Sequence, residues 1–399
     1  MSHPLKTTTT NEAAHRKAIS IDVLPPTFRD AVTVTIRLNI RHLWIDSLCI
    51  IQNDLRDWQT EASKMAAIFQ GAYMTIAATS SPDSTGGLFF EVPNSQLRVG
   101  RQSGEDAETT VHFTNSILYW QCRERYASED GLLDEQTFGS LEEEFEWVDK
   151  EFYSKYFAKN PRIAWYMLAQ NYSERALSFM KDKFPAMAGL IRAHQQQTGA
   201  TPILGLWKDT LHFDLCWRID DPSESQASLQ NIPSWTWLSC DDFISYEGVV
   251  AYTSGQRESS SKFNVVDWSV QWADEPFTSE LIHWHLAVRG PFGSCKIPKG
   301  ILLENVAEQK EVEAFLGLSA DGLRCFNIGP DTLGAPVDHE AVSFLHLCAG
   351  GATGLYFFVL LPVQGKPNTY RRVGIGSSSI DSAVDILINS APEETIFLV

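Results

Sequence analysis

The chain has 399 residues, of which 44% are hydrophobic and 21% are charged, and its formal net charge is −18. This composition is ordinary for a globular protein and provides enough residues for two domains. The acid excess argues against electrostatic binding to nucleic acid or anionic membranes, which require clustered Lys and Arg, and no apolar run is long enough to predict a membrane span.

Residues 1–19 are polar and are predicted to form a poorly ordered segment. Residues 24–27 then carry two prolines, which suit the first turn of a helix. The predicted helix covers residues 28–38, and its apolar stripe consists of Ala31, Val34 and Leu38.

A short apolar run over residues 43–45 follows, as expected of a strand that is buried on both faces. Polar residues come directly after it: Asp46, Ser47, Cys49 and Gln52. In open α/β sheets, ligands bind beyond the carboxyl ends of the strands. A ligand-binding edge is therefore predicted here.

The next predicted helix begins with Asp54 as N-cap and Asp57 in the capping-box position, and Gly71 ends it. One helical face carries apolar residues at spacings of four, three and four: Trp58, Ala62, Met65 and Phe69. Residues 73–78 are predicted as the next buried strand. Helix, strand, helix and strand in this order predict a parallel sheet with crossover helices.

In the rest of the chain, predicted helices come first and predicted strands follow. The helices cover residues 142–156, which begin with an acidic run at 142–144, and residues 161–172 and 183–197. The apolar stripe of the last helix consists of Ala186, Leu190 and Ala193. One strand is predicted over residues 116–122. From about residue 230 the apolar residues alternate with period two, which favours antiparallel strands. The alternating or apolar segments are Trp235/Trp237 and residues 265–272, 283–288, 344–347 and 357–361.

The N-terminal part resembles the fungal heterokaryon-incompatibility (HET) domain family. The resemblance rests on residues 24–32, 43–58, 72–81 and 87–90, on Glu61 and Met65, and on residues 4–11. Weaker similarity continues in residues 172–190, 205–211, 232–239 and 370–376. An early strand that the family normally carries before residue 4 has no place here, so the chain looks like a member shortened at the N-terminus.

The resemblance implies a TIR-like or flavodoxin-like parallel sheet that lacks its first strand, followed by an α+β half rich in antiparallel strands. We expect a polar segment at 1–19, a HET-like α/β domain with an acidic insertion at 20–160, and a C-terminal region at 161–399. The family implies a role in fungal allorecognition and programmed cell death, through protein partners and possible homo-oligomers.

Two carboxylates are the candidate catalytic groups. The HET family is thought to be distantly similar to TIR domains, some of which cleave NAD with a helix-borne glutamate one turn after a tryptophan. Trp58 and Glu61 repeat that spacing, and a carboxylate there could stabilise an oxocarbenium-like cation. The alternative is a surface glutamate paired with Lys64. Asp46, at the end of the predicted strand, is either a ligand contact or a structural aspartate that bonds neighbouring backbone.

The other candidates have more ordinary readings. Trp44, Ser47, Cys49, Gln52 and Trp58 are predicted to form a ligand or partner surface beside these carboxylates. Cys49 would be a nucleophile only with a nearby His, for which His42 is the local candidate, and an inert thiol is the alternative.

No cofactor or metal is predicted, although NAD remains a possible substrate. His283 and His285 have the spacing of metal ligands on a strand, but no third ligand is identifiable. The alternating Trp235 and Trp237 suggest either a partner surface or core packing. Seven scattered cysteines with no C-x-x-C pair, and no apolar N-terminal signal, indicate a reduced cytoplasmic protein.

Overall fold

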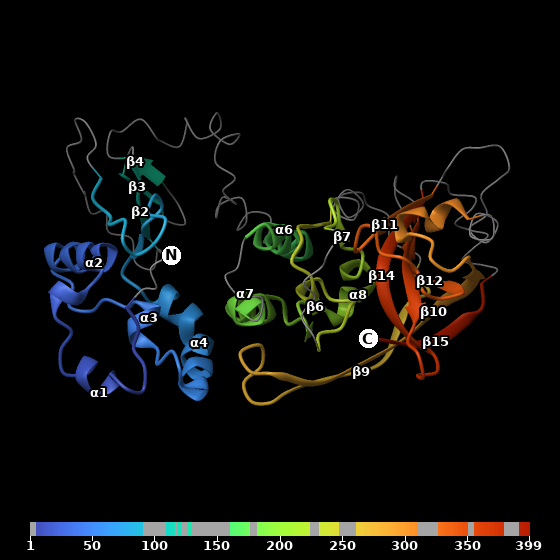
Figure 1. Cartoon of the computed structure of the whole chain (residues 1–399), viewed down its shortest axis with the longest axis horizontal. Coiled ribbons are helices and arrows are strands. Elements are labelled where there is room, and N and C mark those ends of the chain that lie inside the picture. The colour runs from blue at the N-terminus through green and yellow to red at the C-terminus, as the bar shows by residue number, and fades with distance from the viewer. Residues whose placement is uncertain are drawn as a thin grey trace. The chain divides into compact units, whose positions relative to one another are not determined.

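The computed structural model describes residues 5–90, 109–115, 118–121, 126–128, 160–175, 182–223, 231–246, 261–309, 326–349, 355–378 and 391–399. The chain divides into two compact units, residues 1–155 and 156–399. Each unit has its own main sheet, and Figure 1 labels many of the elements of both. The acidic run at 142–144 and the helix predicted over 142–156 lie outside the described residues.

The helices of the first unit are short except for two. They are α1 (Glu12–His15), the 3₁₀ turn η1 (Ile21–Val23), α2 (Pro26–Arg37), α3 (Asp46–Cys49) and α4 (Leu55–Gln70). The helix predicted over residues 28–38 is confirmed as α2, which begins at Pro26 because a first-turn residue needs no N–H partner. Ala31 is buried on this helix, and Val34 packs against the same small core.

The strand predicted over residues 43–45 is wrong. This segment forms no strand and belongs to no sheet, and its three side chains are only half-buried. Ile45 instead serves as the N-cap of α3, so the chain turns into a helix where the prediction placed a sheet edge. The apolar run reflects packing rather than strand pairing, because Leu43 joins the small core and Trp44 contacts Phe69.

Helix α4 begins as predicted. The Asp54 carboxylate accepts hydrogen bonds from the backbone N–H groups of Arg56 and Asp57, at 2.9 and 3.1 Å. The predicted capping box does not form, because the Asp57 carboxylate accepts from the N–H of Ile51 at 2.7 Å instead. Asp57 therefore fixes the loop that enters the helix. The helix ends at Gln70, directly before Gly71 as predicted, but Gly71 is its C-cap, with φ −86°, rather than the predicted C′ residue.

The sheet of the first unit is mixed rather than parallel. β1 (Thr75–Ala77) pairs in parallel with β2 (Thr110–Phe113), and β3 (Leu118–Gln121) and β4 (Tyr126–Ser128) follow in antiparallel order. The strands predicted over 73–78 and 116–122 are thus present in shorter form. Only the β1–β2 pair realises the predicted parallel arrangement within the described residues of this unit.

The second unit opens with a layer of helices and short strands. The bounds are α6 (Pro161–Ser173), α7 (Lys183–Thr198), β5 (Pro202–Ile203), β6 (Leu206–Trp207), η4 (Lys208–Thr210), α8 (Leu211–Asp214), β7 (Arg218–Ile219), η5 (Trp237–Ser239) and β8 (Ile244–Ser245). The helices predicted over 161–172 and 183–197 are confirmed as α6 and α7.

The stripe predicted for α7 faces the wrong way. Ala186 and Leu190 are exposed, whereas the buried positions include Lys183 and His194. Lys183 is buried because its ammonium group donates to the backbone carbonyls of Trp237 and Cys240. Because the charged Lys183 lies on the buried face of α7, apolar periodicity predicted the wrong face of the helix.

The strand expected at Trp235 and Trp237 is also wrong. Trp237 starts the 3₁₀ turn η5, where the Thr236 hydroxyl accepts from the N–H of Leu238. Both indoles are nevertheless fully buried in the main core of this unit. Core packing, one of the two readings of these residues, therefore describes them.

Seven strands form the second sheet: β9 (Asn264–Trp272), β10 (Leu281–Lys296), β11 (Phe326–Pro330), β12 (Ala341–Ala349), β13 (Leu355–Pro362), β14 (Thr369–Ser378) and β15 (Glu393–Leu398); η6 (Leu303–Glu308) lies between β10 and β11. The order runs β11-β14-β13-β12-β10-β15, and β14 also pairs with β15. This parallel pairing closes a ring of five strands, which are orange to red in Figure 1. The antiparallel-rich C-terminal half is as predicted.

This sheet is covered on both faces. Along β13, Phe357, Val359 and Leu361 join one core cluster, while Phe358 and Leu360 join the other. Burial on both faces explains why residues 357–361 form a continuous apolar run rather than an alternating one. None of the helices in the described part of the chain is both long and apolar enough to cross a membrane.

Candidate functional site

The predicted site residues of the first unit surround a loop that the N-terminal segment closes. The N–H of Thr7 donates to the Ser47 carbonyl and the N–H of Gln52 donates to the Thr7 carbonyl, both at 2.8 Å. These bonds place Thr7 beside Ile51 in a parallel bridge. The segment thus supplies to this loop the pairing that a neighbouring strand would otherwise provide.

Side chains strengthen this closure. The Thr7 hydroxyl donates to the Leu48 carbonyl at 2.7 Å and lies 2.9 Å from His15 Nδ1. Asn53 accepts from the N–H of Thr9 and donates to its hydroxyl, at 2.8 and 3.0 Å. The prediction of a poorly ordered N-terminal segment is therefore wrong for residues 5–18. Its Thr and Asn side chains satisfy backbone groups that would otherwise need water.

Four of the predicted residues lie on this loop. The exposed Asp46 accepts from the N–H of Ser47 at 2.7 Å, while its carbonyl accepts from the Gln52 amide at 3.2 Å. Ser47 is buried, and Cys49 presents an exposed thiol. Asp46 thus bonds neighbouring backbone, which is what a structural aspartate does.

Glu61 lies on α4 one turn after Trp58. Its carboxylate accepts from the Lys64 ammonium at 2.7 Å, and 26% of the side chain is exposed. This is the surface ion pair with Lys64 that was the alternative to a catalytic role for Glu61. The pair leaves the Glu61 carboxylate reachable from solvent, because the partner is a flexible, exposed lysine.

Trp44 lies at the other end of α4. Its ring packs edge-to-face on Phe69 with centroids 5.7 Å apart. Since α4 rises about 1.5 Å per residue, roughly 12 Å of helix separates Phe69 from Glu61. The structure therefore splits the predicted surface into the loop at Asp46, the Trp58–Glu61 turn, and an aromatic end at Trp44.

That aromatic end is more exposed than the sequence indicated. Phe69 is 42% exposed and Tyr73, just beyond the helix, is 60% exposed. The N–H of Ala72 donates to the Phe69 carbonyl, so the chain leaves the helix tightly at this point. We call Trp44, Phe69 and Tyr73 the aromatic patch. Helical periodicity predicted that Phe69 is part of the core. The only signal for an exposed position is that Phe69 lies near the end of α4, beyond the buried Ala62.

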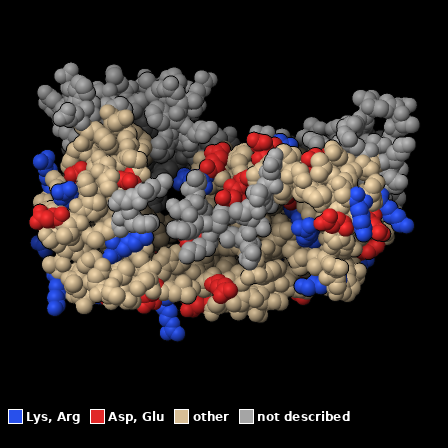
Figure 2. Space-filling view, in the orientation of Figure 1, with Lys and Arg blue, Asp and Glu red and all other residues tan. Residues whose placement is uncertain are grey.

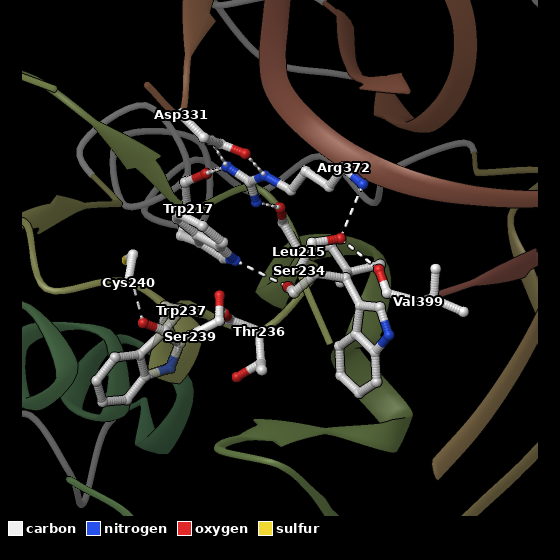
Figure 3. Close-up of polar contacts among 11 residues, drawn as sticks. Leu215, Trp217, Ser234, Thr236, Trp237, Ser239, Cys240, Asp331, Arg372 and Val399 are labelled. Atoms are coloured by element: carbon white, nitrogen blue, oxygen red, sulfur yellow. Dashed lines mark hydrogen bonds and ion pairs between the residues drawn. The ribbon is translucent and has the colours of Figure 1, made fainter. Parts of the chain in front are cut away.

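The second unit holds a buried arginine at the centre of its polar contacts (Figure 3). Arg372 is 3% exposed and donates to both carboxylate oxygens of Asp331 at 3.0 Å. It also donates to the carbonyls of Leu215 and Trp217 at 3.1 and 2.6 Å, and its guanidinium lies 3.3 Å from the Trp217 ring centroid. This group ties the connection after α8 to strand β14.

A buried aspartate forms a second polar centre in this unit. Asp214 is fully buried and accepts from the Tyr166 hydroxyl, the N–H of Trp207 and the Thr210 hydroxyl, at 2.7, 2.6 and 2.9 Å. Burial raises the pKa of the Asp214 carboxyl to about 7, although these three donors oppose the shift. The arrangement holds β6, η4 and α6 together.

The two predicted histidines on β10 differ in their surroundings. His283 is exposed, and His285 Nε2 lies 3.3 Å from an Asp267 carboxylate oxygen on β9. Within the described ranges, no three His, Cys, Asp or Glu side chains are arranged to hold a metal ion. On the face shown in Figure 2, the described Lys and Arg side chains form small separated groups among Asp and Glu.

Comparison with known proteins adds one finding. Residues 2–175 match the family model described as "Heterokaryon incompatibility protein (HET)". The match covers the loop, α4 and the aromatic patch, and it ends at the close of α6. No curated protein and no solved structure matches the chain.

Proposed function

Since residues 2–175 match the heterokaryon incompatibility (HET) family model, we propose that the chain is a signalling module of fungal nonself recognition, the process that kills fused cells of unlike type. It would work in the cytoplasm by contact with protein partners or with copies of itself. The observation that supports contact rather than catalysis is the aromatic patch.

The patch has the composition of a protein-binding surface. Exposed aromatic side chains offer large apolar area and lose little conformational entropy on binding, so they dominate the energetics of protein interfaces. Phe69 is already held by its contact with Trp44, which reduces the ordering cost further. A partner that covers Phe69 and Tyr73 would remove both from water.

The test is a viability assay in a fungal host that expresses the full chain from an inducible promoter. Truncation of each interface aromatic costs about 2 kcal/mol, or roughly 30-fold in affinity. We therefore expect wild type to reduce viability and the variant Phe69→Ser/Tyr73→Ser to restore it. Leu55→Ser is the matched control, because Leu55 is 69% exposed at the opposite end of the same helix.

Protein levels and thermal unfolding of each variant show whether a loss of effect comes from a loss of folded protein. Equal killing by wild type and by the folded double variant would contradict a role for the patch. Loss of killing in Leu55→Ser alone would place the contact surface at the other end of α4.

The alternative is a TIR-like hydrolase that cleaves NAD with Glu61. The observation in its favour is that Glu61 lies one turn after Trp58 on α4, with its carboxylate reachable from solvent. On the proposed contact mechanism, purified full-length protein incubated with NAD releases no nicotinamide above the rate of a Glu61→Gln variant. Lys64→Met is the control, because it frees the carboxylate and would increase a reaction that depends on Glu61. Release that Glu61→Gln abolishes would establish the hydrolase.

A further inference from the structure

Two thiols of the second unit lie in contact although 132 residues separate them in the sequence. Cys216 follows α8 and Cys348 lies on β12, and their sulfur atoms are 3.7 Å apart. Both side chains are buried in the main core. A disulfide has a sulfur separation of about 2.05 Å, so the two atoms would have to approach by roughly 1.6 Å.

The Cys216 side of this contact is held in place. Arg372 donates to the carbonyls of Leu215 and Trp217, which flank Cys216 on both sides. The Cys216 thiol also donates to the His212 carbonyl at 3.2 Å. Figure 3 shows the arginine with these two flanking residues. The sulfur of Cys216 is therefore presented to β12 from a fixed backbone.

The Cys348 side can yield. The register between β12 and β13 shifts between His346 and Cys348, which marks a local bulge. Bulges bend a strand and interrupt its hydrogen-bond ladder, so small movements there cost less than in a regular ladder. A small displacement of Cys348 toward Cys216 is therefore least opposed at this point of the strand.

We propose that Cys216 and Cys348 form an oxidisable pair that hydrogen peroxide converts to a disulfide, which locks the helical layer of this unit to its ring of strands. One sulfur attacks peroxide, the O–O bond breaks, and a sulfenic acid and water form. The second sulfur attacks the sulfenic sulfur, the S–S bond forms, and the hydroxyl group leaves as a second water. The two thiols together lose two electrons and two protons, and peroxide is reduced.

The environment sets the order in which the thiols react. Burial raises the pKa of the Cys216 thiol well above its ordinary value, which keeps the thiolate scarce. The pair should therefore react more slowly than the exposed Cys49. Once formed, the disulfide closes a loop of 132 residues, and a loop of that size restricts the unfolded chain strongly.

The test is a peptide map of the oxidised full-length protein. The protein is treated with hydrogen peroxide over a time course, blocked with N-ethylmaleimide in denaturant, and digested without reductant for mass spectrometry. We expect a cross-linked peptide pair that contains Cys216 and Cys348 and that dithiothreitol separates. Cys348→Ala should lack it, whereas Cys240→Ala should retain it because Cys240, also buried, contacts the Trp237 carbonyl.

A second measurement separates a lock from incidental damage. The urea midpoint of the oxidised wild-type protein should lie above that of the reduced protein, and peroxide should give no such increase in Cys348→Ala. Complete oxidation of Cys49 without the Cys216–Cys348 cross-link, sustained to the end of the time course, would overturn the proposal. A cross-link that lowers the midpoint would equally exclude a lock.

Discussion

Replacing Arg372 with Met is expected to lower the free energy of unfolding of the second unit by about 3–5 kcal/mol. The guanidinium donates to the buried Asp331 carboxylate and to two backbone carbonyls, so Met leaves a buried charge and two acceptors without their donor. Burial already raises the pKa of Asp331, and Arg372 opposes that shift. Without the arginine, folding would favour the protonated aspartate.

Urea unfolding of the full chain, followed by tryptophan fluorescence, measures this effect. The neighbouring Arg371 is exposed, so Arg371→Met is the matched control and should change the free energy of unfolding by no more than about 0.5 kcal/mol. The double variant Arg372→Met/Asp331→Leu removes both charges and should recover part of the loss. Equal stability of wild type and Arg372→Met would show that the pair does not hold β14 to the helical layer.

The second large effect is a pH dependence centred on Asp214. Its carboxyl has a pKa of about 7 in the folded chain against the ordinary 3.8, so the folded state binds the proton more tightly than the unfolded state. Such a group stabilises the fold fully below its unfolded pKa, and this contribution is lost as the pH rises through the folded pKa. Between pH 4 and 8 the loss amounts to about 4 kcal/mol.

The measurement compares the free energy of unfolding of wild type and Asp214→Asn across that pH range. The variant cannot titrate at this position, so its stability should fall less steeply with pH than that of wild type. Asp209→Asn changes an exposed carboxyl on the same segment and should keep the wild-type slope. Parallel curves for wild type and Asp214→Asn would contradict a titrating buried carboxyl.

Local signals predicted the helices best. Prolines before residues 28–38, the cap at Asp54 and the proline at 161 each mark a helix start, and α2, α4 and α6 begin within two residues of those marks. These signals act over one or two turns, so nothing distant overrides them. The apolar run over residues 43–45 lacked such a signal. It packs against α4 and the small core, and sequence alone cannot distinguish that from strand pairing.

The polar centres of the second unit could not be predicted, because their members are far apart in the chain. Arg372 lies 41 residues from Asp331 and 155 from Trp217, and Tyr166 lies 48 from Asp214. A lone Arg or Asp in the sequence resembles any surface charge until the fold supplies its partners. The buried face of α7 was mispredicted for the same reason, because the partners of Lys183 are 54 and 57 residues away in the chain.

In the candidate site, the sequence predicted the polar residues of the loop and helix α4, but not that the N-terminal segment contacts the loop. Asp46, Ser47 and Gln52 do lie together, because they share one short loop. Thr7 lies more than forty residues from the loop in the sequence, so no local pattern predicts their contact. The exposure of Phe69 and Tyr73 depends on where the surrounding elements stop, which is again a property of the whole unit.

The most direct test of contact-based signalling is the NAD content of fungal cells during induced expression of the full chain. If the protein signals by contact, cells expressing wild type lose viability while their NAD content stays at the level of cells carrying an empty vector. The variant Phe69→Ser/Tyr73→Ser should then abolish the killing, and Glu61→Gln should not. A collapse of NAD that precedes death and disappears in Glu61→Gln would instead identify the protein as an enzyme.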